Sequence, residues 1–354
     1  MTMKHTMAII GFGGMGNWHW ESIKENLTEL TVKGAYDIRE ERQEKIRELG
    51  MYAYQSAEEL LADEEIELVT IAVPNNFHKD YAIACMKAGK NVICEKPVTL
   101  NAAELEEIIA VSKATGKLFT VHQNRRWDRD YRIVKNILDS GVIGKPYFVE
   151  TRVQGSRGSM FGWRGYKENG GGMLYDWGVH LLDQLLDMLQ GKVLSVSAQL
   201  KTVFSGEVDD NVKVFLQFEN EVSALLEFST NCFINHPRWH VSCTDGTAVV
   251  ENWECQGKIV KLAENADEMS WADDIVYTAA GPTRTMAPRP SHTTQVIELP
   301  EEHPKWSEYY ENVLAVLEGR EALIVKPEQC LRVMKLIDAI FAASRSGGVM
   351  TCEI

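Results

Sequence analysis

Two patterns of hydrophobic and polar positions divide this chain. From residue 7 to about residue 123, short apolar runs alternate with stretches in which apolar residues recur at helical spacing. The runs predict strands, and the stretches between them predict helices. The predicted strands cover 7–13, 30–37, 66–74, 90–97 and 117–124, and the predicted helices cover 15–26, 39–49, 78–89, 101–116 and 128–141. Strands that alternate with helices of this length indicate βαβ units and a parallel sheet.

After about Pro146 the pattern changes to strands without helices between them, which predicts an antiparallel sheet. These strands cover 146–154, 193–204, 211–220 and 222–234. Helical spacing returns at 307–319 and 327–347, whereas 263–293 is polar and irregular and is interpreted as a long loop. The chain is therefore expected to be an α/β protein with two domains, at 1–124 and 125–354. We expect the last helix to pack back on the first domain.

Composition narrows the possible partners. The 354 residues carry a formal net charge of -14, so neither a nucleic acid nor an anionic membrane is an expected partner. Seven scattered cysteines without a C-x-x-C pair indicate reduced thiols rather than a disulfide framework. The first residues do not resemble a signal peptide, and no apolar run is long enough to span a bilayer. We expect a cytoplasmic protein.

The first strand is followed directly by "GFGGMG", a G-x-G-x-x-G pattern. Such glycines allow a tight turn, close approach of the backbone to a pyrophosphate, and close packing of helix on strand. The helix that follows would present its first amides to the phosphates. This pattern predicts a Rossmann dinucleotide-binding domain. The loop residues expected at the cofactor are Gly11, Phe12, Gly13, Gly14, Met15 and Gly16.

Asp37 ends the next predicted strand, at a spacing that suits a carboxylate bonded to the ribose hydroxyls of NAD. The alternative is that Asp37 caps the helix at 39–49. Arg39 or Arg42 could instead bind a 2′-phosphate, so NADP stays open beside the favoured NAD. Ile38 and Arg39 are expected next to the cofactor with Asp37.

A second glycine cluster occurs in "NGGGMLYDWGVHLLD", residues 169–183. Three consecutive glycines at 170–172 cost conformational entropy, which suggests a backbone that passes close to something. Asp176 and His180 are four residues apart, so on a helix both side chains would share one face. Asp183 and Asp187 lie on that same face, and Asp183 is the better candidate to line a site.

With "AVPNNFH" at 72–78 and "EKP" at 95–97, these motifs stand in the order seen in one family. Over essentially its full length the chain resembles the glucose-fructose oxidoreductase / inositol dehydrogenase / MocA (Gfo/Idh/MocA) family. The resemblance implies an NAD(P)-dependent sugar or polyol dehydrogenase. It also implies a second domain with a large open, mainly antiparallel sheet, through which dimers or tetramers form.

The resemblance implies catalytic roles for Lys96, Asp176 and His180. His180 would remove the hydroxyl proton, Asp176 would orient the imidazole, and Lys96 would stabilise the substrate oxygen. The glycines at 170–172 would let the backbone pass close to cofactor and substrate. The structural alternatives are a core histidine at position 180 and a solvated turn lysine at position 96.

Further contacts are expected around this trio. Those to the cofactor come from Pro74, Asn75, His78, Glu95, Lys96, Gln123, Trp163 and Arg164, with Glu95 near the ribose. Those to the substrate come from Asn124, Arg126, Tyr175 and His236 beside the trio. His236 and His240 are four apart, but Pro237 and strand-like flanks argue against a helical metal site, and no ligand set is completed. No metal is expected.

Three functions follow from these observations. The leading hypothesis is a dehydrogenase acting on a sugar, cyclitol or glycoside hydroxyl. The second is a glycosidase that oxidises its substrate transiently and keeps its cofactor. The third is a non-catalytic binding module, against which the intact Lys96, Asp176 and His180 argue.

Overall fold

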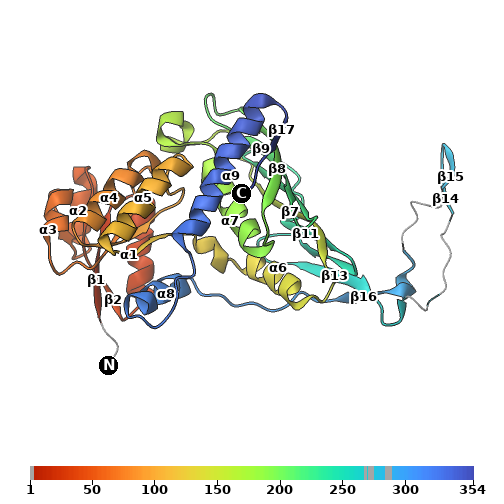
Figure 1. Ribbon diagram of the computed structural model, residues 1–354, viewed down its shortest axis with the longest axis horizontal. Helices are drawn as coiled ribbons and strands as arrows, with labels where there is room; N and C mark the ends of the chain where they lie inside the picture. The colour runs from red at the N-terminus through yellow and green to blue at the C-terminus, as the bar shows by residue number, and fades with distance from the viewer. Residues whose placement is uncertain (1–3, 267–268, 270–274, 284–288) are drawn as a thin grey trace.

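The computed structural model describes residues 4–266, 269, 275–283 and 289–354, and it contains two large sheets (Figure 1). Six strands form the first sheet in the order β3-β2-β1-β4-β5-β6, and every neighbouring pair is parallel. The strands are β1 (His5–Ile10), β2 (Leu30–Tyr36), β3 (Tyr52–Ala53), β4 (Leu68–Ile71), β5 (Asn91–Cys94) and β6 (Phe119–Val121). The parallel sheet is thus confirmed.

Helices α1 to α5 pack around this sheet (Figure 1). They are α1 (Gly14–Asn26), α2 (Glu40–Glu48), α3 (Ala57–Ala62), α4 (His78–Lys87) and α5 (Ala102–Thr115). Strands β1, β4 and β5 are almost wholly buried, as expected where helices cover both faces of a parallel sheet. The order reverses between β1 and β4, and ligands of such sheets bind at the carboxyl ends of the strands beside this point.

The second sheet has nine strands in the order β16-β13-β12-β11-β7-β10-β9-β8-β17. Their bounds are β7 (Pro146–Gln154), β8 (Val193–Lys201), β9 (Asn211–Phe218), β10 (Ser223–Ser229), β11 (Trp239–Cys243), β12 (Gly246–Val250), β13 (Gly257–Leu262), β16 (Thr294–Ile297) and β17 (Val349–Thr351). Only the central β7–β10 pair is parallel, so the expected mainly antiparallel sheet is confirmed.

Helices α6 (Arg129–Ser140), α7 (Val179–Met188) and α9 (Pro327–Ser346) lie between this sheet and the first domain (Figure 1). Helix α9 contacts β8 on one side and α5 on the other, and Asp338 accepts a hydrogen bond of 3.0 Å from the Ala102 amide. Helix α8 (Ser307–Leu317) packs against α1, so the chain returns to the first domain before it enters α9. No described helix is long and apolar enough to cross a membrane.

The hydrophobic pattern did not predict the shortest helices and strands. Strand β3 has two residues and α3 has six, too few to establish a period, and β11 to β13, β16 and β17 were also missed. Part of the expected long loop at 263–293 forms a hairpin, β14 (Val276–Thr278) with β15 (Gly281–Thr283). Positions 267–268, 270–274 and 284–288 of that loop lie outside the described residues.

The glycine run at 170–172 packs against protein atoms on both sides. A Cβ on Gly170 would overlap Leu100 of the first domain, and a Cβ on Gly171 would overlap the Arg164 carbonyl oxygen. Gly172 has a φ of +106°, and its Cβ would overlap the Asp209 carboxylate. Gly170 thus approaches atoms of the first domain closely, whereas Gly171 and Gly172 approach atoms of their own domain.

Replacing Gly172 by alanine is expected to lower the free energy of unfolding by about 2–5 kcal/mol, from backbone strain and overlap with Asp209. Gly348→Ala is the matched control, because its Cβ would meet only the Ser346 hydroxyl at 3.8 Å. Urea unfolding of both variants checks this. Equal stability of the two variants would show that the turn adjusts without cost.

Candidate functional site

The glycine loop after β1 has the shape needed to hold a pyrophosphate. A Cβ on Gly11 would lie 2.5 Å from the Ala72 carbonyl oxygen, and a Cβ on Gly16 would overlap the Gly11 carbonyl oxygen. Gly13 and Gly14, in contrast, face open space. Helix α1 begins there without a side-chain cap, so its first amides can receive phosphate oxygens. Met15 is exposed at this loop, whereas the Phe12 side chain is buried in the core.

Asp37 stands directly after β2, beside this loop. Its carboxylate accepts hydrogen bonds from the Phe12 amide at 2.8 Å and the Arg39 amide at 3.0 Å. Helix α2 has Arg39 as its N-cap residue, so the alternative of Asp37 as that cap is not met. The Arg39 guanidinium lies 3.3 Å from Glu41 and 3.8 Å from Asp37, and Ile38 is exposed. The carboxylate is thus placed where Rossmann domains bind the adenosine ribose.

The loop after β4 fastens neighbouring segments together. Asn75 is buried and donates a hydrogen bond of 3.0 Å to the Gly170 carbonyl of the second domain. The two ring nitrogens of His78 lie 2.9 Å from the carbonyls of Val73 and Pro97. Burial lowers the pKa of His78. Both side chains, expected at the cofactor, therefore contact protein, whereas Pro74 precedes them partly exposed.

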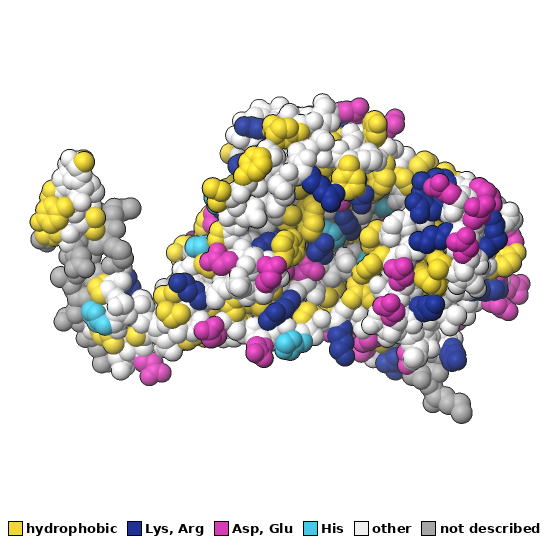
Figure 2. Space-filling view, turned by 180° about the vertical axis from the view of Figure 1, so that it is seen from behind, with side chains coloured by type: hydrophobic (Ala, Val, Ile, Leu, Met, Phe, Trp, Pro, Cys, Tyr) yellow, Lys and Arg dark blue, Asp and Glu magenta, His cyan; other side chains and the backbone are white. Residues whose placement is uncertain are grey.

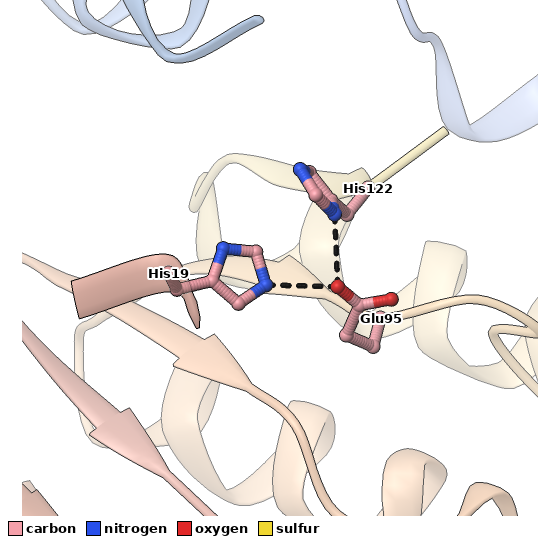
Figure 3. A group of neighbouring side chains, drawn as sticks. All are labelled: His19, Glu95 and His122. Atoms are coloured by element: carbon pink, nitrogen blue, oxygen red, sulfur yellow. Dashed lines mark hydrogen bonds and ion pairs between the residues drawn. The ribbon is translucent and has the colours of Figure 1, made fainter. Parts of the chain in front are cut away.

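Glu95, expected near the ribose, lies instead at the centre of a buried polar cluster (Figure 3). Its Oε1 accepts hydrogen bonds of 2.8 Å from His19 on α1 and from His122 after β6. Its Oε2 accepts the Lys96 amide at 3.1 Å. Burial alone would raise the pKa of Glu95, but the two imidazoles outweigh it and hold the pKa well below its usual value. With 5% exposure and both oxygens bonded, Glu95 supports the Lys96 backbone.

The cluster continues through the first domain. His19 Nδ1 lies 2.9 Å from the Tyr310 hydroxyl on α8, which in turn lies 3.3 Å from Thr70 on β4. The ligand atoms of His19, Glu95 and His122 lie within 4.8 Å of one another, close enough to surround a metal ion. However, these atoms satisfy each other by hydrogen bonds. Local sequence pattern gave no signal for the cluster, because its three members come from separate elements.

Lys96 and Asp176 meet across the domain junction. The Lys96 ammonium donates to the Asp176 carboxylate at 3.2 Å and to its backbone carbonyl at 2.8 Å. Arg164 Nε reaches the same carboxylate oxygen at 3.1 Å. Burial alone would raise the pKa of Asp176, but the positive charges of Lys96 and Arg164 lower it below its usual value. An ammonium has three donors, so these two bonds leave one.

His180 is 3% exposed, and within the described residues its Nδ1 has no hydrogen-bond partner. Burial, helped by the positive charges of Lys96 and Arg125, lowers the pKa of His180 well below its usual value. The Trp177 ring lies 6.0 Å from the imidazole. His180 is therefore held neutral, with its Nδ1 enclosed by protein and unpartnered.

The expected support of His180 by Asp176 is not observed. Asp176 lies in a π-helical turn, η5 (Leu174–Gly178), and His180 lies in the α7 helix that follows. A π-helical turn changes the angular spacing, so the assumption of one common helical face does not hold. The Asp176 carboxylate is bonded to Lys96 and Arg164 instead.

Several other expected substrate contacts point into the protein. Arg126 is buried and forms two hydrogen bonds of 2.7 Å with Asp183, with a third of 3.2 Å to Asp187. Arg126, expected at the substrate, and Asp183, expected to line the site, thus satisfy each other's charge. Both form a buried ion pair between η2 (Asn124–Trp127) and α7.

Tyr175, also expected at the substrate, contacts the first domain and α9. Its hydroxyl donates a hydrogen bond of 2.5 Å to the Leu100 carbonyl, and its ring packs on Phe341 of α9 at 5.3 Å. It lines a cavity of about 590 Å³ that includes Asp209 and, among the described residues, neither Lys96 nor His180.

The other residues expected at the cofactor or substrate differ in their exposure and in their contacts. Gln123 is buried, Asn124 is partly exposed, and Trp163 stacks with the Arg164 guanidinium at 4.5 Å. His236 is exposed, and its amide donates to Gln154 at 2.9 Å. On the face shown in Figure 2 the surface is hollowed between the two domains, and lysine or arginine and histidine side chains show inside the hollow.

Known proteins share both the fold and the order of these motifs. Residues 5–123 match the model of an oxidoreductase family with an NAD-binding Rossmann fold, and residues 131–249 match the GFO/IDH/MocA C-terminal domain. The structure of an NAD-binding protein from Listeria innocua is 40% identical, with a TM-score of 0.93, over 99% of this chain and all of that one.

Several relatives are named as inositol dehydrogenases, among them the following two. The scyllo-inositol 2-dehydrogenase (NADP(+)) of Bacillus subtilis is 24% identical over 98% of this chain and 96% of its own length. The myo-inositol 2-dehydrogenase of Thermotoga maritima is 29% identical over 63% of this chain and 68% of its own length.

The electrostatics of the site predict a titration result. His180 is expected to titrate well below 6.5, the usual value, and Lys96→Met should raise its pKa, because a positive neighbour that opposes imidazolium formation is removed. Lys79→Met, which removes a surface lysine 3.5 Å from Glu107, should leave it unchanged. NMR titration of the imidazole checks this, and a lower pKa in Lys96→Met would contradict it.

Proposed function

Because the chain belongs to the Gfo/Idh/MocA family of NAD(P)-dependent oxidoreductases, we propose that it transfers a hydride between a secondary hydroxyl of a sugar or cyclitol and the nicotinamide. The observation that carries this proposal is the meeting of Lys96 with Asp176 at the domain junction, beside a buried and neutral His180. Relatives named as inositol dehydrogenases support a cyclitol or a sugar as the substrate class.

The glycine loop, the start of α1 and Asp37 would hold the cofactor, which supplies the hydride acceptor when bound. Oxidation of an alcohol also releases a proton. His180 can accept it, since burial and nearby positive charge keep the imidazole neutral. The remaining donor of Lys96 stabilises negative charge on the substrate oxygen as the proton leaves.

Asp176 acts in this scheme through Lys96 and not through His180. Its carboxylate and backbone carbonyl fix two of the three ammonium donors, which aims the third. Glu95 holds the backbone amide of Lys96 from the other side. The lysine is thus oriented at both ends, as a group that must meet a developing charge requires.

The cofactor preference that we propose is NAD over NADP. The Asp37 carboxylate would accept the ribose hydroxyls and repel a 2′-phosphate, while Arg39 lies 3.3 Å from Glu41 and Arg42 lies 3.7 Å from it.

Replacing His180 by alanine is expected to slow turnover by about 10²–10⁴-fold, the range for loss of a general base. Lys96→Met should also lose turnover without unfolding, and Asp176→Asn should give a smaller loss with a shifted pH profile. His303→Ala, which removes a surface histidine, is the matched control. The measurement is NADH formation with cyclitols, aldoses, sugar acids and simple glycosides, together with NAD affinity, which should hardly change.

Near-normal rates for His180→Ala at saturating substrate would remove His180 from the mechanism. Product formation without net NADH would instead indicate transient oxidation with the cofactor retained.

Replacing Asp37 by serine should narrow the ratio of kcat/KM for NAD over that for NADP, because the charge that repels the 2′-phosphate is lost. Steady-state kinetics with both cofactors at equal concentration measure this ratio. A clear NADP preference in the unmodified protein would contradict the assignment and identify Arg39 or Arg42 as dominant.

A further inference from the structure

Two tryptophans from distant segments stand side by side next to His180. Trp177 belongs to the π-helical turn η5, and Trp253 belongs to the turn between β12 and β13. The ring centroids of His180 and Trp177 are 6.0 Å apart, and those of Trp177 and Trp253 are 5.7 Å apart. The three rings form a row that leads outward from the candidate base.

Two arginines hold this row in place. Arg125 lies 4.2 Å from the Trp177 ring centre and 5.7 Å from that of Trp253. Arg238 is buried and lies 3.9 Å from the Trp253 ring centre. Cation–π contacts of this kind fix a ring and cover one of its faces.

The turn that carries Trp253 is itself rigid. The Asn252 side chain donates to Gln256 at 2.7 Å and accepts the Gln256 amide at 3.1 Å. The Cys255 amide also donates to the Asn252 carbonyl at 3.1 Å. Trp253 is nevertheless 48% exposed. A large aromatic ring is thus presented to solvent by a turn that is already ordered, a costly arrangement unless a ligand covers it.

The charges around the row indicate a neutral ligand. Arg125 is paired with Asp128 at 2.8 Å, and Arg238 is paired with Asp130 at 2.6 Å. Because both guanidinium charges are neutralised, they offer little attraction to an anion. The electron-rich face of an indole attracts the slightly positive C–H groups on one face of a pyranose ring.

We propose that Trp253 and Trp177 form a sugar subsite that holds a second ring, bonded to the ring that reacts at His180. The preferred substrate is then a sugar whose reacting ring carries a second ring, as in a disaccharide. This inference rests on the proposed function for the location of the reacting hydroxyl. A ring at His180 and a ring at Trp253 are separated by the width of Trp177, which suits adjacent units of one saccharide.

The test compares matched one-ring and two-ring sugars, such as glucose, methyl glucosides, glucose disaccharides and their galactose counterparts. With wild type, the two-ring member of an active set should have the lower KM. Trp253→Ala should raise that KM roughly 3- to 10-fold, as expected for loss of one stacked ring. The kcat values and the KM of the one-ring sugar should stay unchanged. Tyr147→Ala, which removes another exposed aromatic side chain, is the control.

Calorimetric binding of the same sugars to the NAD-loaded protein separates the two proposals. If no NADH forms but wild type binds two-ring sugars more tightly than Trp253→Ala does, the proposed function is wrong and the subsite is supported. If Trp253→Ala binds every sugar as wild type does, or if one-ring sugars bind as tightly as two-ring ones, the subsite is wrong. It is also wrong if Trp253→Ala weakens NAD binding alone, because the ring then serves the cofactor.

Discussion

Lys96 and Asp176 come from different domains, and the 3.2 Å ion pair between them exists only while the domains keep a fixed spacing. Both groups are largely buried, so a broken pair would leave an uncompensated charge at low dielectric. Gly170 permits this spacing, because a Cβ there would collide with Leu100 of the first domain. The hydrogen bond from Asn75 to Gly170 fastens the same junction. Precise domain packing is thus a condition of the chemistry.

His180 and Asp176 have different charge states, although burial opposes the charged form of both. The His180 imidazole is neutral because burial and nearby positive charge disfavour the imidazolium and lower its pKa. Its Nδ1 has no hydrogen-bond partner among the described residues. Asp176 keeps its charge, since Lys96 and Arg164 outweigh the burial that would raise its pKa. Their environments thus separate a neutral proton acceptor from a permanent anion. These two charge states fit the proposed alcohol oxidation, in which His180 accepts a proton and Asp176 holds the Lys96 ammonium in position.

The sequence could predict what local pattern encodes. Hydrophobic period located the parallel sheet, and glycine spacing predicted the cofactor loop, whereas the roles of Lys96, Asp176 and His180 came from the family resemblance. Contacts between distant segments had no such signal: the His19–Glu95–His122 cluster joins three elements, and Trp253 meets Trp177 from another strand turn. The expectation that Asp176 and His180 share one helical face failed because Asp176 lies in a π-helical turn. The ion pair of Arg126 could not be predicted from local pattern, because its buried partner, Asp183, lies 57 positions away.

Isotope effects on a single turnover test most directly whether His180 takes the proton. Bound NAD would be reduced by an active substrate, protiated or deuterated at the reacting carbon, in H₂O and in D₂O. The account predicts that both deuterium substitutions slow NADH formation by the wild type, and that the solvent effect, unlike the carbon effect, is lost in His180→Ala. A solvent effect of the same size in His180→Ala would contradict it, because the proton would then leave through another group.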